Sequence, residues 1–307
     1  MIPERLTPGD TIGIIAPSDP ILPEITEHLE IGCDVLRSMG FKIKFGHHIY
    51  SNTLGFAAAP QEKARDINSM FDSPTVKAII CAQGGETSNA TLQWINWTNI
   101  RRHPKIFLGI SDITVLLNTI YQKTNLVTFH GTDIIWGFGN NIDPFERDEF
   151  QRLLIDGQPG TYPANRSRKT LRNGKAKGRL VGGNIGALLK LAGTPYWPDF
   201  TNAIFFVEAY EITAKACHSA FYQMGQLGVF DQISGAIVGY IDGMQREGSK
   251  GPQMEDILLS VTTEKSFPIL KINDFGHNCA NTILPIGGEV MMDAAKQDLQ
   301  LTSRVVK

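Results

Sequence analysis

Short apolar runs alternate with amphipathic segments through the first half of the chain. Each run has the length of a buried strand, and the apolar residues after it recur at three- and four-residue steps, as on one buried face of a helix. The expected strands are 11–16, 41–45, 76–81, 106–108 and 126–129, and the expected helices carry their apolar faces at 25–36, 60–71, 90–95 and 113–120. Strands that alternate with helices at this spacing predict right-handed crossovers and a parallel sheet covered on both faces.

The second half keeps the mixed α/β pattern but is more often broken by glycine. The pattern resumes with the segment 179–184. After it we expect helices at 185–192 and 216–227 and strands at 202–207, 237–241 and 267–272. The strand at 202–207 is a continuous apolar run, which is typical of a fully buried position in a sheet.

A polar region separates the two halves. Residues 143–151 are polar, and 157–177 are rich in Gly, Pro, Asn, Ser, Arg and Lys with little apolar periodicity, which favours a linker at 157–177. We therefore expect an N-terminal parallel-sheet α/β domain over 1–156 and a smaller, strand-rich α/β domain over 178–307. The basic residues of the linker are typical of a solvated, mobile surface, although they could also face an acidic substrate: Arg166, Arg168, Lys169, Arg172, Lys175 and Lys177.

Composition narrows the class of partner. The chain has 307 residues, about twice a typical domain, and 42% are hydrophobic, so a large core is available. A net charge of -2 gives no reason to expect nucleic acid or an anionic membrane as partner, and a small molecule is favoured. No apolar run is long enough to span a membrane and the first residues lack a secretory signal, so a cytoplasmic location is predicted.

Neither a metal nor a cofactor is expected. The cysteines (Cys33, Cys81, Cys217 and Cys279) are scattered without a C-x-x-C pair, which argues against a disulfide framework and against a thiolate metal site. Gly84-Gly85 follows the strand at 76–81, but the lysine of a phosphate-binding loop is missing and no G-x-G-x-x-G follows any strand.

The segment 105–117 predicts a strand, a sharp turn and a helix, with Ser111 at the crest of the turn. A serine in that position lifts its hydroxyl clear of the sheet, beside the free backbone N–H groups that begin the helix. The ordinary alternative is that Ser111 only caps the helix, since serine is a favoured N-cap residue. The turn also lacks the second glycine of the G-x-S-x-G elbow.

Other polar residues stand at the ends of expected strands. Glu208 follows 202–207, with Glu211 as a rival, and His277 follows 267–272. A serine nucleophile needs an imidazole to take its proton, and the imidazole needs a carboxylate to hold its tautomer. Ser111, His277 and Glu208 could form such a triad. Otherwise Glu208 is a surface carboxylate and His277 a turn histidine. His130, which follows the strand at 126–129, could be catalytic, but a histidine at a strand end more often makes a structural hydrogen bond, so we expect it to lie behind the reacting groups.

Several blocks of sequence, in order along nearly the whole chain, resemble the S66 serine peptidase family. That family contains the cytoplasmic L,D-carboxypeptidases of peptidoglycan recycling and the microcin C self-immunity peptidases. The matching blocks are G-G-E-T-S-N, P-K-I-F-L-G-I-S-D-I-T, L-V-T-F-H-G, L-V-G-G-N-I-G-A-L-L-K-L-A-G-T-P-Y-W-P-D-F, I-F-F-V-E and D-F-G-H-N.

The resemblance implies roles for individual residues. Ser111 would be the nucleophile, His277 the general base and then acid, and Glu208 the carboxylate that orients it. The backbone N–H groups of Gly85 and Asp112 would form the oxyanion hole. The family fold is an N-terminal α/β domain and a smaller C-terminal domain with the site between them, and the family also implies a homodimer.

The glycine turn and the aromatic residues of the loop 162–177 bear on which substrate is expected. The turn G-G-E-T-S-N resembles the microcin-immunity branch more than the L,D-carboxypeptidases, yet the loop 162–177 lacks the tryptophan typical of that branch and has only Tyr162 as an aromatic residue. Trp136 could wall the pocket instead, and Gly84 and Asp133 are expected to contact substrate.

Three functions follow from these observations. The favoured one is a serine carboxypeptidase or amidase that cleaves an L,D-muropeptide or a microcin-type peptide nucleotide through an acyl-enzyme. A second is a non-catalytic two-domain protein that binds peptide fragments. A third, an amidotransferase-like hydrolase, would need a cysteine where Ser111 stands.

Overall fold

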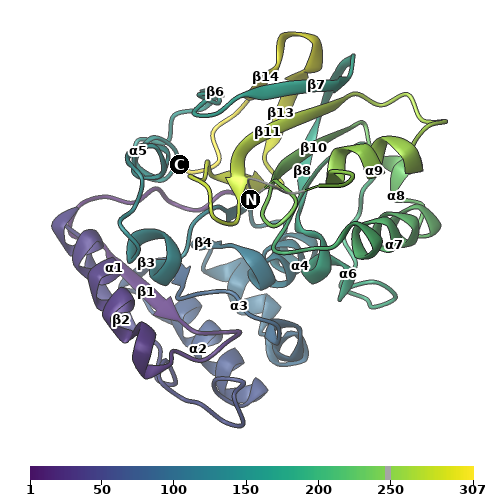
Figure 1. Cartoon of the computed structure of the whole chain (residues 1–307). Coiled ribbons are helices and arrows are strands. Elements are labelled where there is room, and N and C mark those ends of the chain that lie inside the picture. The colour runs from purple at the N-terminus through teal and green to yellow at the C-terminus, as the bar shows by residue number, and fades with distance from the viewer. Residues whose placement is uncertain (246–249) are drawn as a thin grey trace.

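The first half of the chain forms a parallel sheet whose strands alternate with helices (Figure 1). The structure is a computed structural model that describes residues 1–245 and 250–307. The strand order is β2-β1-β3-β4-β5, with every neighbour parallel. The strands are β1 (Thr11–Ile15), β2 (Lys42–Phe45), β3 (Val76–Cys81), β4 (Ile106–Gly109) and β5 (Thr128–His130). The central strands β3 and β4 are almost wholly buried, as the apolar runs predict for a parallel sheet covered on both faces.

The helices of this half follow the predicted apolar faces. They are α1 (Thr26–Ser38), α2 (Pro60–Asp72), α3 (Trp97–Arg102) and α4 (Thr114–Thr124). Helix α4 buries the residues predicted for its inner face, among them Leu116, Leu117 and Ile120. The stretch expected as a helix at 90–95 is instead part of a 3-10 segment, Ser88–Trp94.

The second half contributes another set of parallel strands, in the order β8-β9-β10-β11. These are β8 (Lys175–Asn184), β9 (Ile204–Ala209), β10 (Gly235–Ile241) and β11 (Ile269–Gly276). Their helices are α6 (Ile185–Leu189), α7 (Ala214–Gln226), α8 (Val229–Gln232) and α9 (Met254–Val261), and α7 packs against α9. The fold class is therefore α/β in both halves.

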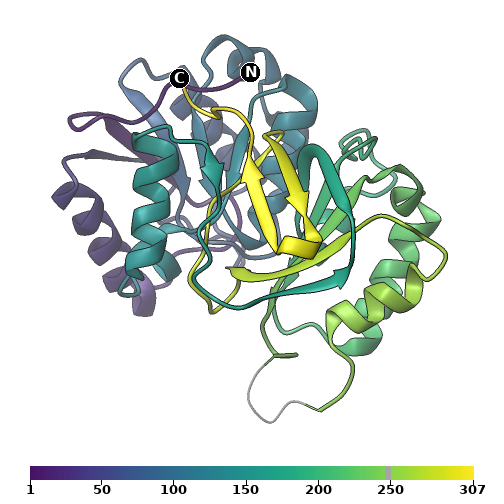
Figure 2. The ribbon, with the colours of Figure 1, turned by 90° about the horizontal axis from the view of Figure 1, so that it is seen from above.

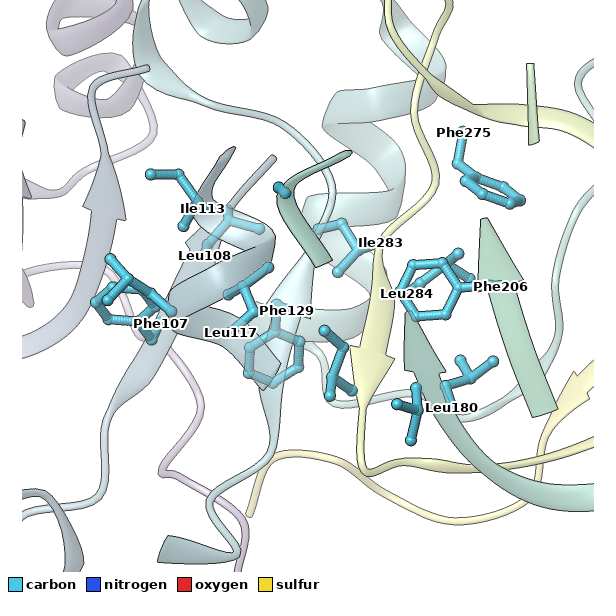
Figure 3. Packing of buried hydrophobic residues seen from close by; sticks show 14 of the residues in the cluster. Phe107, Leu108, Ile113, Leu117, Phe129, Leu180, Phe206, Phe275, Ile283 and Leu284 are labelled. Carbon is cyan, nitrogen blue, oxygen red and sulfur yellow. The ribbon is translucent and has the colours of Figure 1, made fainter. Parts of the chain in front are cut away.

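One short strand joins the two sheets. Strand β12 (Leu284–Ile286) pairs antiparallel with β5 and parallel with β8, so the sheet runs on from one half into the other. Leu284 of β12, Phe129 of β5 and Phe206 of β9 all belong to one buried core (Figure 3). This shared core fixes the strand ends of the two halves relative to one another.

A smaller antiparallel sheet is built on β8. Strand β13 (Glu289–Asp293) pairs with β8 and with β14 (Asp298–Leu301), and β14 pairs with the two-residue strand β6 (Gly160–Thr161). The two ends of the chain lie side by side (Figure 2), where the N–H of Lys307 donates to the carbonyl of Pro3.

The polar segment 157–177 is more ordered than its composition predicts. Strand β7 (Arg168–Arg172) pairs antiparallel with β11 at the edge of the sheet, and β8 begins at Lys175. The expectation of a solvated, mobile surface is wrong for Arg168, whose guanidinium lies 3.7 Å from the buried Asp274. Charged residues are common on edge strands because they discourage pairing with a second sheet, so the charge pattern obscured a strand.

A helix was also missed in the polar stretch 143–151. Helix α5 (Pro144–Phe150) begins after Asp143, whose carboxylate accepts the N–H of Phe145, and it continues as a π-helical turn over Gln151–Ile155. An N-cap aspartate followed by proline is a helix start signal that the polar composition hid. No helix in the described part of the chain is long and apolar enough to cross a membrane.

Candidate active site

The turn after β4 holds Ser111 in a strained backbone conformation. Its φ is +63°, in the left-handed region that side chains other than glycine seldom adopt. Neither the 3-10 turn Ser111–Ile113 nor α4 has a side-chain cap, and within the described residues the Ser111 hydroxyl makes no hydrogen bond. The capping interpretation of Ser111 is therefore wrong. Strain of this kind at a strand-to-helix turn is typical of an exposed nucleophile.

Gly84 makes room for this turn. A Cβ atom added at Gly84 would lie 2.6 Å from the Cβ of Ser111 and 2.9 Å from its hydroxyl oxygen. Any larger residue would push against the serine, so the expected glycine turn after β3 is required by a close approach and not only by its own conformation.

His277 and Glu208 form a hydrogen-bonded pair. Nδ1 of His277 lies 2.6 Å from Oε2 of Glu208, which is fully buried at the end of β9. Burial acts to raise the pKa of Glu208, but the charge and hydrogen bond of His277 outweigh it, so the pKa lies below its ordinary value. Burial likewise acts to lower the pKa of His277, and Glu208 outweighs it, so that pKa lies above its ordinary value. The pair thus favours a charged imidazolium, and it leaves Nε2 of His277 as the ring nitrogen not engaged by Glu208.

Ser111 and His277 line the same cavity, which has a volume of about 800 Å³. Four other residues predicted for the site line it as well: Gly84, Gly85, Asp133 and Trp136. No hydrogen bond joins Ser111 to His277 within the described residues. Such contacts are often loose in a free enzyme and tighten when substrate is bound.

Gly85 and Asp112 adjoin the residues that meet at the serine turn: Gly85 follows Gly84, and a Cβ atom at Gly84 would lie 3.4 Å from the backbone nitrogen of Asp112. Gly85 has a φ of +137°, and a Cβ atom there would lie 2.2 Å from Asp19 and 2.6 Å from the Ser18 hydroxyl. In the described structure, neither N–H group has a hydrogen-bond acceptor. Unengaged backbone N–H donors close to a nucleophile are what an oxyanion hole requires.

Asp133 and Trp136 meet at the wall of the cavity. The Asp133 carboxylate accepts the backbone N–H groups of Trp136 and Gly137 at the start of a π-helical turn, Ile134–Phe138, and burial raises its pKa to about 7. Trp136 is 52% exposed, and its indole N–H donates to the side-chain oxygen of Gln83. Asp133 therefore holds the turn that presents Trp136.

His130 lies close to the carboxylate of Glu208. It is fully buried 4.0 Å from Oε1 of Glu208, and its ring nitrogens have no hydrogen-bond partner among the described residues. Burial lowers its pKa to about 4, so it is neutral at physiological pH. His130 does not line the cavity, whereas His277 does.

Sequence reasoning missed other residues of the cavity wall. Glu146 is buried and has a pKa raised to about 7 by that burial, and Arg166 and Tyr210 line the same space. Glu146 lies on the helix that the polar composition hid. Arg166 belongs to the segment expected as a linker, for which contact with a substrate was one of the alternatives. No cluster of histidine, cysteine and acidic residues in the described ranges could hold a metal ion.

Family models match both halves of the chain. The N-terminal domain of the LD-carboxypeptidases, peptidase S66, matches residues 12–131, and the C-terminal domain of the same family matches residues 177–292. The chain belongs to the S66 LD-carboxypeptidase family. Its members are serine peptidases, so this S66 chain is an enzyme of the hydrolase class.

Two kinds of relative resemble this S66 chain to a similar degree. A probable murein peptide carboxypeptidase of Bacillus subtilis strain 168 is 30% identical, over 96% of this chain and 92% of that protein. The microcin C7 self-immunity protein MccF of Escherichia coli is 28% identical, over 97% and 95%. A structure of MccF in complex with glutamyl sulfamoyl guanosine matches with a TM-score of 0.92 at 26% identity, covering 100% of this chain and 99% of that one.

Proposed function

We propose that this S66 chain hydrolyses an amide bond near the free carboxylate end of a small peptide conjugate, through an acyl-enzyme on Ser111. The observation that carries the proposal is the hydrogen-bonded pair of His277 and Glu208 facing the cavity that also holds the strained Ser111. The non-catalytic alternative predicts loss of a triad member, and all three residues are present.

In the proposed reaction, Nε2 of His277 takes the proton of Ser111 as the serine oxygen attacks the carbonyl carbon. Glu208 holds the tautomer and stabilises the imidazolium. The tetrahedral oxyanion is bound by the N–H groups of Gly85 and Asp112. His277 then gives its proton to the leaving amine as the C–N bond breaks. His277 then takes a proton from water as the water oxygen attacks the carbonyl carbon of the acyl-enzyme. The ester C–O bond to Ser111 breaks, the acid is released, and His277 returns the proton to the serine oxygen.

Two substrate classes fit this chemistry: a muropeptide with a terminal L,D bond and a microcin-type aminoacyl nucleotide. Solved structures of MccF hold sulfamoyl nucleosides, and the exposed Trp136 ring offers a planar surface for a base. Tyr162, the aromatic residue of the 162–177 loop, is not available to stack on a base, because it is only 1% exposed and packs under the guanidinium of Arg152. Arg166 on the cavity wall suits the free carboxylate of either substrate.

The test is the variant Ser111→Ala. We expect it to remain folded and to lose hydrolysis of both an L,D-tetrapeptide and aspartyl sulfamoyl adenosine, whichever the wild type cleaves, by about 10⁶-fold, as in other serine peptidases that lose the nucleophile. Undiminished activity would exclude Ser111 as nucleophile. A serine-directed fluorophosphonate, read by intact mass, gives an independent result: an adduct on Ser111 favours the enzyme, and no adduct favours the binding protein.

The family resemblance also leads us to propose a homodimer in this S66 chain. Sedimentation velocity at several protein concentrations checks the oligomeric state, and a single monomeric species throughout would contradict it.

A further inference from the structure

The carboxylate of Asp112 is buried and fully engaged beside the serine. Its side chain is 1% exposed, and Oδ2 accepts the Ser18 hydroxyl at 2.6 Å and the backbone N–H of Ser88 at 2.8 Å. Oδ1 accepts the ammonium of Lys190 at 2.6 Å. The carbonyl of Asp112 also accepts the hydroxyl of Ser88 at 2.9 Å. The proposed mechanism uses only the backbone N–H of Asp112, so these side-chain contacts need another explanation.

These contacts tie together the two loops that carry the proposed oxyanion donors. Ser88 ends the glycine turn that contains Gly85, and Asp112 follows the nucleophile. The turn is braced again through Ser18, whose hydroxyl lies 3.2 Å from the N–H of Thr87 and so links that residue to Asp112. The Asp112 carboxylate therefore joins its own loop to the loop that carries Gly85.

Lys190 brings the second half of the chain into the same network. It follows α6, and its ammonium donates to the carbonyl of Glu86 at 2.8 Å as well as to Asp112. Both acceptors belong to the first half, one on each donor loop. Docking of the two halves, which also delivers His277 and Glu208, therefore completes the brace on the oxyanion hole.

We propose that Asp112 and Lys190 are a positioning pair, which fixes the spacing of the two oxyanion donors only when the two halves are docked. The inference rests on the proposed function, because it assigns these residues a role in the oxyanion hole of that reaction. A buried carboxylate that only stabilised the fold would affect unfolding without affecting the rate at which Ser111 reacts.

The experiment compares Asp112→Asn, Lys190→Met and the double variant with the wild type. The rate of fluorophosphonate reaction at Ser111 is measured as a maximal rate and a half-saturating concentration, beside kcat and KM for the L,D-tetrapeptide. We expect the maximal rates to fall about ten- to a hundred-fold with little change in half-saturation, since displaced donors weaken transition-state binding. The double variant should be no slower than the slower single variant, because the residues act as one unit.

Two further variants separate positioning from stability. Lys105→Met removes a buried ammonium that donates to the carbonyls of Met70 and Ser73 at the far end of β4, so it should lower the melting temperature and leave the rate at Ser111 unchanged. Ser18→Ala removes one of the three hydrogen bonds to the Asp112 carboxylate, together with the link to Thr87, and should give a smaller loss than Asp112→Asn.

The outcomes distinguish this inference from the proposed function. Rates within twofold of the wild type in both Asp112→Asn and Lys190→Met, in a protein that labels at Ser111, would overturn the positioning pair alone. Loss of rate in Lys105→Met equal to that in Asp112→Asn would also overturn it. The proposed function and this inference would fall together if the wild type does not label at Ser111 and the Ser111→Ala variant still hydrolyses the substrate.

Discussion

The first half of the chain presents Ser111 to the cavity through backbone geometry, whereas the second half presents His277 through a buried charge. On the serine side, a positive φ, two close-packed glycines and unengaged N–H groups shape the site. On the histidine side, a carboxylate with no exposure to solvent fixes one ring nitrogen. Activity should therefore be most sensitive to side-chain size at residues around Ser111, and to side-chain charge and pH at residues around His277.

The largest effect after loss of the serine is expected for Glu208→Gln. It keeps the shape of the side chain but removes the charge that stabilises the imidazolium, so kcat/KM should fall by about 10³- to 10⁴-fold, as when a triad carboxylate is replaced in other serine peptidases. The control is Glu211→Gln, because Glu211 does not line the cavity. Equal losses in the two variants would contradict the assignment of Glu208.

The same variant should also change the pH dependence. His277 must be neutral to accept the serine proton, so activity is lost as pH falls through its pKa, which Glu208 holds above the ordinary value of a histidine. Removing the carboxylate charge lowers that pKa, and the acid limb of the kcat/KM profile should move to lower pH. An unmoved acid limb would show that another group sets it.

A smaller effect is expected from size on the serine side. Gly84→Ala adds a methyl group 2.6 Å from the Cβ of Ser111, which must displace the turn, and a displacement near 1 Å costs on the order of 10²-fold in rate. Gly225→Ala in α7 is the matched control, because its new methyl group would meet only ordinary contacts at 3.5 Å. Similar activity in both variants would show that the serine turn tolerates movement.

The smallest effect is expected at the cavity wall. Trp136→Ala leaves both sides of the catalytic arrangement intact and removes an exposed ring held by Gln83. We expect KM for aspartyl sulfamoyl adenosine to rise by about ten-fold, since stacking on a base contributes roughly 1–3 kcal/mol, with little change in kcat. An unchanged KM for this nucleoside would favour the peptide class of substrate.

Much of the fold follows from local pattern. The apolar runs locate β1, β3 and β4 within a residue, because a strand buried on both faces has no polar positions to blur its ends. Helix α5 and strand β7 were missed for the opposite reason. Their exposed faces are charged, and their places depend on partners distant in sequence, such as Asp274 for Arg168.

The sequence by itself determined the α/β class, the family and the residue types at the strand ends, since these depend on short-range periodicity and on motifs that stay together in the chain. Only the tertiary structure decided that Ser111 has a positive φ, that His277 pairs with Glu208, that Tyr162 is buried, and that the carboxylate of Asp112 binds Lys190. Each of these depends on partners distant in sequence, such as Glu208 for His277 and Lys190 for Asp112, and such distances are set by the packing of the whole fold rather than by any local pattern.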